Sequence, residues 1–300
     1  MTVGRSGITP IKQKNVQDIL SSRIGKCSGI WKKDKDSAWY NQEDKQNTFI
    51  DFTAGDMSSD ETSPMTFIQT LRKYSYFPSV LYLIEKDRKT FQSLLHNIRK
   101  LNVRTNYNVL SPMFKDDHDL CTVDAEHCKV PPEIILKNMD LCSFLGEFQG
   151  YHRYRFGLAY YDPNGFKYQD FKCLFSFIRN NPRMDIMMNI NATQIKRNAG
   201  VMKCKGFAKY RNISLDKVIK SIAQYKKTVF IRNNFAIESD FNPKSTHKFI
   251  LLYATNDPNQ KMPDEFGFVT IQSEEGQQLI NKYNYGSKEN KHSGAVCQPV

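Results

Sequence analysis

Short apolar runs alternate with longer amphipathic segments through the first two thirds of the chain. The runs have the length of buried strands, and the amphipathic segments repeat their apolar positions at helical spacing. Strands are predicted at residues 49–52, 80–84, 107–110, 156–161 and 184–190, and helices at 64–73, 87–98 and 168–179. The first two strands lie about thirty residues apart, which is the length of one βαβ crossover. The pattern therefore predicts an α/β fold with a Rossmann-like, doubly wound sheet.

The clearest helix follows the second strand. Phe91, Leu94, Leu95 and Ile98 recur at helical spacing and form one apolar face. The helix before it carries Pro64 in its first turn, where the missing N–H costs no hydrogen bond.

The alternation changes character after Asn191. A basic segment is followed by a predicted helix at 214–225, strands at 228–231 and 248–254, and a late helix at 273–283. We expect this part, residues 192–283, to be a basic C-terminal extension that completes the sheet. Residues 284–300 are predicted to be a disordered tail.

Two further parts flank or interrupt the predicted core at 46–191. Residues 1–45 form a polar, partly helical leader, which we expect to pack on the edge of the main domain. Residues 111–153 are acidic at first and contain two consecutive prolines, so they resemble an insertion. A helix is predicted within the insertion from Glu133 to Met139.

The composition is that of a folded protein. Of the 300 residues, 40% are hydrophobic and 12% are aromatic, which is enough for a full core. No segment approaches the roughly 18 consecutive apolar residues of a membrane span, and the first residues lack the apolar core of a secretory signal. A soluble, cytoplasmic protein without a membrane partner is therefore expected.

The seven cysteines are odd in number and scattered, so no disulfide framework is predicted and the thiols are expected to be reduced. His118, Cys121, His127 and Cys128 could supply four metal ligands. Their spacing fits no standard zinc motif, and no metal site is predicted.

The charge is strongly positive and unevenly placed. The formal net charge is +12, and residues 192–248 hold thirteen Lys and Arg against three Asp and Glu. Aromatic residues are interleaved with these bases, a combination suited to phosphate contacts and to stacking on unpaired bases of DNA or RNA. A solvated basic face with its aromatics in the core remains the alternative. The candidate nucleic-acid contacts are Lys196, Arg197, Lys203, Lys205, Lys209 and Arg211.

Acidic residues end three of the predicted strands. Asp51 follows the first strand, Glu85 the second, and Asp162 begins the turn after the run at 156–161. Ligands of open α/β sheets bind at the carboxyl ends of the strands. The three acids therefore predict one shared pocket.

The first turn favours a particular class of ligand. It has one glycine, Gly55, where a dinucleotide site has three, and it begins with the carboxylate of Asp51. A carboxylate in place of a phosphate cradle favours a ligand with an amino-bearing end, such as S-adenosylmethionine, and Glu85 suits the ribose hydroxyls. The candidate cofactor-binding residues are Asp51, Phe52, Thr53, Ala54, Gly55, Glu85 and Lys86.

These motifs resemble those of the three-Cys-motif partner proteins, a family with a Rossmann domain of the class I methyltransferase type. The matching segments are Phe49 to Gly55, Ser63-Pro64, Ile84-Glu85-Lys86-Asp87, Asp162-Pro163-Asn164-Gly165 and Ala254-Thr255-Asn256. They occur in the family's order across about two thirds of the chain. The resemblance implies S-adenosylmethionine as cofactor.

The turn at Asp162 is also similar to the Asp-Pro-Pro-aromatic motif of methyltransferases that act on base amines. The resemblance implies that Asp162 accepts a hydrogen bond from the amine and that Pro163 shapes the turn. If the protein is such a methyltransferase, Asn164 is expected to face the amine as well. Asn164 and Gly165 depart from the motif, so Tyr161 or Phe166 would have to supply stacking. A plain tight turn is the alternative.

Three functions stay open at this stage. The first is an S-adenosylmethionine-dependent methyltransferase acting on nucleic acid. The second is a non-catalytic protein that binds nucleic acid or a protein partner on a degenerate methyltransferase scaffold, because Met57 stands where methyltransferases usually have a second glycine. The third is a nucleotide-processing enzyme whose acids hold a metal.

Overall fold

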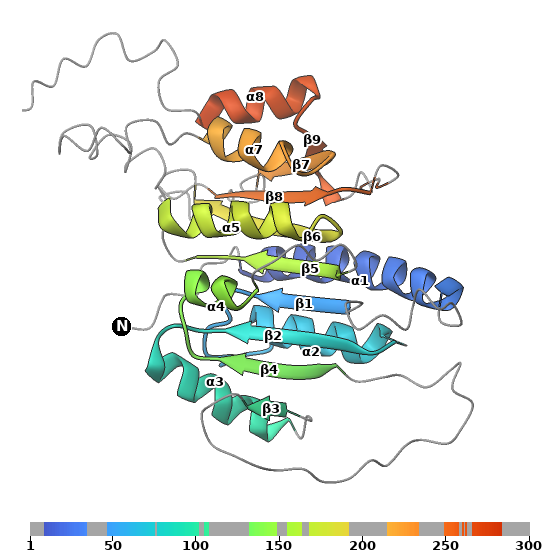
Figure 1. Cartoon of the computed structure of the whole chain (residues 1–300). Coiled ribbons are helices and arrows are strands. Elements are labelled where there is room, and N and C mark those ends of the chain that lie inside the picture. Colours follow the sequence, from blue (N-terminus) through green and yellow to red (C-terminus); the bar gives the residue numbers. More distant parts are fainter. Residues whose placement is uncertain are drawn as a thin grey trace, which may run out of the picture. The chain divides into compact units, whose positions relative to one another are not determined.

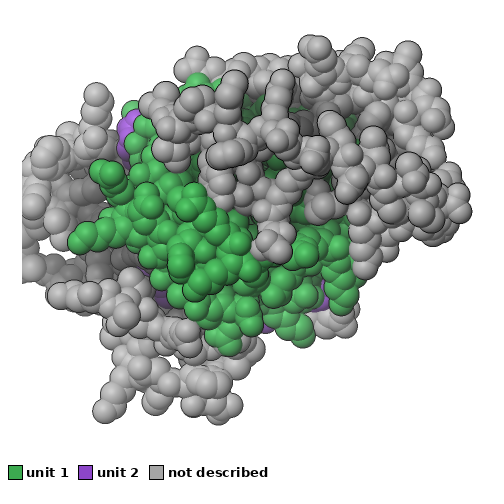
Figure 2. All heavy atoms as spheres, turned by 90° about the horizontal axis from the view of Figure 1, so that it is seen from below, with its two compact units in different colours: residues 1–162, 172–187 green, residues 163–171, 188–300 purple. Residues whose placement is uncertain are grey.

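The protein is represented by a computed structural model whose chain divides into two compact units. The first consists of residues 1–162 and 172–187 and the second of residues 163–171 and 188–300 (Figure 2). The structure describes residues 9–34, 47–75, 77–101, 105–107, 132–148, 155–163, 168–191, 215–233, 249–257, 260, 262 and 266–283.

The first unit is built on strands in the order β3-β4-β2-β1-β5-β6, of which β3, β4, β2, β1 and β5 pair in parallel (Figure 1). Its strands are β1 (Asn47–Asp51), β2 (Ser79–Ile84), β3 (Thr105–Tyr107), β4 (Glu133–Lys137), β5 (Phe156–Tyr161) and β6 (Met184–Asn191). Strand β1 pairs in parallel with both β2 and β5. Strands β2, β3 and β4 therefore lie on one side of β1, and the strands that follow them in sequence, β5 and β6, lie on the other side. The boundary between β1 and β5 is the topological switch point, where ligands of such folds bind.

Helices cover both faces of this sheet. They are α1 (Thr9–Asp34), α2 (Ser63–Tyr74), α3 (Arg88–Lys100), α4 (Leu141–Glu147) and α5 (Tyr168–Asn180). In Figure 1, α1 and α2 lie behind the strands and α4 lies in front of them. The predicted apolar face of α3 is buried. The predicted α/β fold with a Rossmann-like sheet is confirmed by this strand order and these helices, and its methyltransferase type stays a prediction.

One predicted helix is wrong. Residues from Glu133 form strand β4, which pairs in parallel with β2 and lies between β3 and β2 in the sheet. Its two central buried residues, Ile134 and Leu136, alternate with more exposed neighbours, as expected of a strand. The short apolar run was compatible with either structure, and pairing with β2 decided it. The helix of this region is the short α4, which follows the strand.

The N-terminal helix is longer and more central than predicted. The apolar residues Val16, Ile19, Leu20 and Ile24, which recur near helical spacing, are buried. They belong to a 26-residue helix, α1, that contacts α2 and the central strand β5. The leader therefore covers the middle of the sheet and not its edge.

A buried arginine explains this position of α1. Arg23 pairs with Asp185 of β6, with 3.3 Å between Nη1 and Oδ2, and the two side chains are 6% and 2% exposed. Its Nε donates to the Gly157 carbonyl at 3.1 Å, and Nη2 donates to the Arg183 carbonyl at 2.6 Å. A buried guanidinium is tolerated only when its donors are satisfied. The three partners therefore fix α1 against β5 and β6.

Strands β1 and β5 approach each other closely at Gly157. This residue has φ of 139°, and a Cβ built on it would lie 1.7 Å from the Thr48 carbonyl oxygen. Only glycine fits there, both for its backbone conformation and for lack of space.

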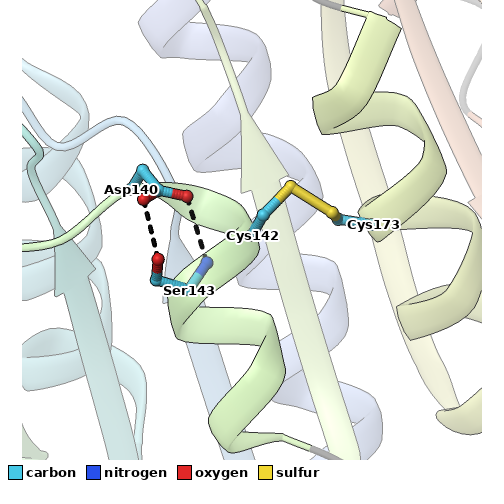
Figure 3. Close-up of a disulfide and its surroundings, with 4 residues drawn as sticks. All are labelled: Asp140, Cys142, Ser143 and Cys173. Carbon is cyan, nitrogen blue, oxygen red and sulfur yellow. Dashed lines mark hydrogen bonds between the residues drawn. A yellow bond between two sulfur atoms is a disulfide. The ribbon is translucent and has the colours of Figure 1, made fainter.

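The expectation of reduced cysteines is wrong for one pair. Cys142 of α4 and Cys173 of α5 form a disulfide (Figure 3). Their 31-residue separation in sequence gave no signal of this pairing. Cys27 is a free, buried thiol, and burial raises its pKa to about 11. The other four cysteines, including Cys121 and Cys128 of the candidate metal group, lie outside the described residues.

The second unit contains an antiparallel group of strands and two helices. Its elements are α7 (Leu215–Ala223), β7 (Thr228–Asn233), β8 (Phe249–Thr255), β9 (Val269–Thr270) and α8 (Glu274–Tyr283). Strand β7 pairs antiparallel with both β8 and β9. All but the two-residue β9 were predicted. The predicted tail at 284–300 lies outside the described residues.

Asn256, the last residue of the Ala-Thr-Asn segment, holds the turn between α7 and β7. Its Nδ2 donates to the Tyr225 carbonyl at 3.0 Å, and its Oδ1 accepts from the Lys227 amide at 2.7 Å. This motif therefore has a structural role in the second unit. Within the described part of the chain, no helix is both long and apolar enough to cross a membrane.

Gly157→Ala should destabilise the protein by at least about 3 kcal/mol, because it combines a backbone clash with an unfavourable left-handed conformation. Gly25→Ala is the matched control, since Gly25 lies in α1 with open space around it. That substitution should stabilise the helix by roughly 0.5–1 kcal/mol. Urea unfolding of both variants measures the difference. Equal stabilities would contradict the close approach of the two strands.

Candidate functional site

Three acidic residues lie at the carboxyl ends of three adjacent strands of the first unit. Asp51 ends β1, Glu85 follows β2, and Asp162 follows β5. Because β1 lies between β2 and β5 in the parallel sheet, all three reach the same edge. The structure therefore brings together the acids that the sequence indicated.

The turn after β1 is fixed by backbone hydrogen bonds to both neighbouring strands. The Phe52 amide donates to the Tyr160 carbonyl at 2.9 Å, and the Ala54 amide donates to the Ile84 carbonyl at 3.0 Å. The fully buried Asp51 accepts from the Thr53 amide through Oδ1 at 3.0 Å. The turn is thus held in one conformation without a ligand.

Gly55 combines an unusual backbone conformation with open space. Its φ is 70°, in the left-handed region that favours glycine, and a Cβ there would meet nothing within 4 Å. Its amide donates to Oε2 of Glu85 at 3.1 Å. The loop of β1 and the acid of β2 are therefore joined directly, and the backbone beside them is open to a bound group.

Met57 adopts the left-handed conformation without being glycine. Its φ is 53° and its side chain is buried. The side-chain amide of Asn97, on α3, donates to the carbonyls of Asp56 at 2.9 Å and Met57 at 3.3 Å. A conformation that costs about 1 kcal/mol or more persists because these contacts and burial support it. The position therefore keeps the backbone shape that a glycine would take.

Glu85 is oriented by two backbone amides. Its Oε1 accepts from the Asp87 amide at 2.8 Å, while Oε2 accepts the bond from Gly55. Each carboxylate oxygen has two acceptor positions, so a half-buried Glu85 keeps capacity for ligand hydroxyls. Asn138, after β4, donates to the Glu85 carbonyl at 2.8 Å. The ends of β2 and β4 are thereby linked.

Asp162 is tied to the first turn and to its own strand. Its amide donates to Oγ1 of Thr53 at 3.0 Å, and Oδ2 accepts from the Tyr160 hydroxyl at 3.2 Å. Burial, followed by the charges of Asp162 and Asp51, raises the pKa of Tyr160 well above its usual 10. The phenol therefore stays protonated and donates to the half-buried carboxylate.

The other predicted site residues have different surroundings. Phe52 and Tyr161 are 3% and 1% exposed, which places both side chains in the core. Phe52 stacks edge-on against Phe144 and Phe177, so its side chain belongs to an aromatic cluster beneath the turn. Ala54 is buried, Lys86 is exposed and Pro163 is half-buried. Stacking on a base from Tyr161 would require this buried side chain to leave the core.

Several predicted residues lie outside the described part of the chain. These are Asn164 and Phe166 of the second turn, and the six basic residues Lys196, Arg197, Lys203, Lys205, Lys209 and Arg211. Among the residues that are described, no group of three His, Cys, Asp or Glu side chains could hold a metal ion.

Two residues of the site were missed in the sequence. Asn97 and Asn138 orient the loop and the strand ends through their side-chain amides. Asn138 follows an apolar run, as the three acids do. If residues 133–137 had been identified as a strand, the place of Asn138 at the carboxyl end of that strand would have indicated it. Asn97 lies within a helix, where its sequence carried no signal.

No protein-family model matches the chain, and no curated protein is similar to it. Among solved structures, a Legionella pneumophila protein has 11% identity over 93% of this chain and 92% of its own, with a TM-score of 0.48. Magnesium protoporphyrin IX methyltransferase from Synechocystis, solved with bound SAH, has 8% identity over 80% and 83%, with a TM-score of 0.36. A fibrillarin/Nop5p complex has 14% identity over 71% and 74%, with a TM-score of 0.38.

These identities and scores are too low to assign an activity or a ligand. The fold class rests instead on the parallel strand order β4-β2-β1-β5 of the first unit, with the crossover helices between its strands. The site is defined by the residues that this order brings to one edge.

Acid should weaken the two helix caps beside the site. Hydrogen bonds from the amide and hydroxyl of Thr90 lower the pKa of Asp87, and those from the hydroxyl and amide of Ser143 lower the pKa of Asp140. Because the folded pKa is the lower one, each cap stabilises the protein above the unfolded value of about 3.9. This stabilisation is lost as the pH falls through the folded pKa.

As the pH is lowered from about 5 to about 2, the unfolding free energies of the Asp87→Asn and Asp140→Asn variants should therefore fall less steeply than that of the wild-type protein. Glu61→Gln removes an exposed acid from the loop before α2 and serves as the control. Chemical unfolding at a series of pH values measures the slopes. Slopes equal to that of wild type in both cap variants would contradict this account.

Proposed function

We propose that this chain is an S-adenosylmethionine-dependent methyltransferase that acts on nucleic acid, with the exocyclic amine of a base as acceptor. The observation that carries the proposal is the linked group of Asp51, Glu85 and Asp162 at the switch point of a Rossmann-like sheet. These acids belong to three turns that are joined through Gly55 and Thr53.

The residues of the first two turns fit the proposed cofactor. Glu85 is half-buried and oriented by two amides, so its remaining acceptor positions suit ribose hydroxyls. Gly55 offers open backbone beside it, and the buried Asp51 would act from below by fixing the turn through the Thr53 amide. Bound there, S-adenosylmethionine would supply an electrophilic methyl group.

Asp162 is proposed to orient the amine that accepts the methyl group. Its carboxylate already accepts one hydrogen bond from Tyr160, and its amide is held by Thr53. A carboxylate held in this way can accept a further N–H and fix the direction of the amine lone pair. No separate general base is then required, because a neutral amine attacks by proximity. Pro163 and Asn164 would shape the rest of this turn.

The nucleic-acid substrate is proposed from the basic segment. Thirteen Lys and Arg against three acids between residues 192 and 248 provide the charge for phosphate contacts. The order of the motifs at Asp51, Glu85 and Asp162 also supports a relationship to the three-Cys-motif partner proteins, which we include in the proposal.

A non-catalytic protein on the same scaffold is the second candidate. It is favoured by one observation, the burial of Tyr161, which leaves that aromatic ring in the core and away from a flipped base. Such a protein would bind nucleic acid or a protein partner without transferring a methyl group. Methyl transfer from labelled cofactor to DNA or RNA distinguishes it from the enzyme.

Glu85→Ala should weaken binding of S-adenosylmethionine and of its demethylated product by about 1.5–3 kcal/mol, roughly ten- to a hundredfold in Kd. The reason is the loss of hydrogen bonds to a charged acceptor. Isothermal titration of both ligands measures the effect, with urea unfolding to confirm that the variant is folded.

Glu133→Ala is the matched control for this variant. Glu133 is an exposed acid at the opposite, amino end of strand β4, so its loss should leave binding unchanged. If folded wild-type protein shows no heat with either ligand at millimolar concentration, the methyltransferase proposal fails. Equal weakening by both variants would remove Glu85 from the site.

Binding of oligonucleotides should weaken steeply with salt. If Lys203 and Lys205 contact phosphates, the log–log slope should change by roughly 0.7–0.9 for each phosphate neutralised. The Lys203→Ala/Lys205→Ala variant should therefore flatten the slope by about 1.5. A salt series with single- and double-stranded oligonucleotides measures this, and an unchanged slope would show that the pair does not contact nucleic acid.

A further inference from the structure

The disulfide joins the two helices that follow two of the strands at the site. Helix α4 comes after β4 and Asn138, and α5 comes after β5 and Asp162. Cys142 lies in the first turn of α4 and Cys173 in the second turn of α5 (Figure 3). The bond therefore connects the helix that follows β4 to the helix that follows β5, and both strands end at the proposed binding edge.

The chain segment closed by this bond contains the acceptor side of the proposed site. It runs from Cys142 to Cys173 and includes all of β5, Asp162 and the turn after it. A cross-link restricts the conformations open to the segment that it closes. The oxidised form therefore limits the freedom of the Asp162 turn at both ends.

Helix α4 is short and is held by a cap, by an ion pair between Lys137 and Glu147 at 2.8 Å, and by aromatic packing, besides the disulfide. It has only seven residues, too few for a stable isolated helix. Asp140 caps it by accepting from the Ser143 amide at 3.0 Å and the Ser143 hydroxyl at 2.7 Å. Phe144 packs against Phe148 with ring centroids 4.7 Å apart, and this aromatic cluster reaches Phe177 of α5. Without the bond, the helices would keep this packing but lose their covalent restraint.

The two residues of the disulfide are less buried than the other described cysteine. Cys142 and Cys173 are half-buried, whereas Cys27 is 1% exposed. Cys27 lies in the core, and burial raises its pKa to about 11, which disfavours the thiolate needed for exchange. Among the described cysteines, exchange is therefore confined to this pair.

We propose that Cys142–Cys173 is a reversible thiol–disulfide site whose oxidised form restrains β5 and holds Asp162 in the position proposed for ligand binding. The ligand readout of this inference rests on the function proposed above. The reductant is a dithiol: its thiolate attacks one sulfur to give a mixed disulfide, and its second thiol releases the protein. Two electrons and two protons thus convert the protein disulfide to two thiols, while the dithiol becomes a disulfide.

The test compares oxidised, reduced and re-oxidised wild-type protein. Isothermal titration with S-adenosylhomocysteine should give a Kd that is roughly three- to tenfold higher after reduction, the size expected when a binding loop must be ordered. Re-oxidation should restore the affinity. Alkylation and mass spectrometry should show that Cys142 and Cys173 become labelled on reduction under native conditions.

The Cys142→Ser/Cys173→Ser variant is the control for the other five cysteines. It should bind like reduced wild type and be indifferent to the reductant. An affinity that changes with reductant in this variant, or that is equal in oxidised and fully reduced wild type, would overturn the proposal. So would a disulfide that resists reduction in the folded protein. If the variant does not fold, the wild-type comparison decides.

Hydrogen exchange without ligand separates this inference from the function on which it rests. Amides of β5 and of the turn after it should exchange faster in the reduced protein, because the segment closed by the bond is released. If no ligand binds in either state, the proposed function fails. Unchanged exchange on reduction would then overturn the thiol–disulfide site, and faster exchange would support it.

Discussion

The close approach of β1 and β5 at Gly157 is the constraint on which the first unit depends. A side chain there would overlap the Thr48 carbonyl, so the two central strands pair only because residue 157 is glycine. The Gly157 carbonyl also accepts from Arg23, whose guanidinium pairs with Asp185. One buried cation thus links α1, β5 and β6, and its burial is tolerated because several donors are satisfied. The switch point of the sheet, and with it the site, is built on this junction.

The site is a polar edge above an aromatic core. Phe52 turns its ring into the cluster with Phe144 and Phe177, while the next residue, Thr53, links Asp51 to Asp162. The packing of the Phe52 ring below therefore fixes the polar groups of the first turn above it. The backbone of Met57 is also fixed by its neighbours. It has the left-handed conformation that residues other than glycine rarely adopt, and a hydrogen bond from Asn97 to its carbonyl supports it.

Covalent and non-covalent restraints act on different parts of this arrangement. Hydrogen bonds between turns hold the cofactor side, around Gly55 and Glu85, without any cross-link. The acceptor side, around Asp162, lies within the segment closed by the disulfide. A change of redox state would therefore act directly on the acceptor side and reach the cofactor side through the hydrogen bond from the Asp162 amide to Thr53. The two halves of the proposed site differ in how their geometry is maintained.

The sequence by itself determined the strands with their terminal acids and the amphipathic face of α3, because both depend on local periodicity. It also located Asp51, Glu85 and Asp162 at one edge of the sheet, since parallel strands share a carboxyl edge. Tertiary structure alone decided that residues 133–137 are a strand, because a five-residue apolar run acquires its structure from pairing with β2. It decided likewise that Tyr161 is buried, that Asn97 holds the loop, and that Cys142 meets Cys173. Each of these depends on residues distant in the chain, and such contacts leave no periodic signal in one sequence.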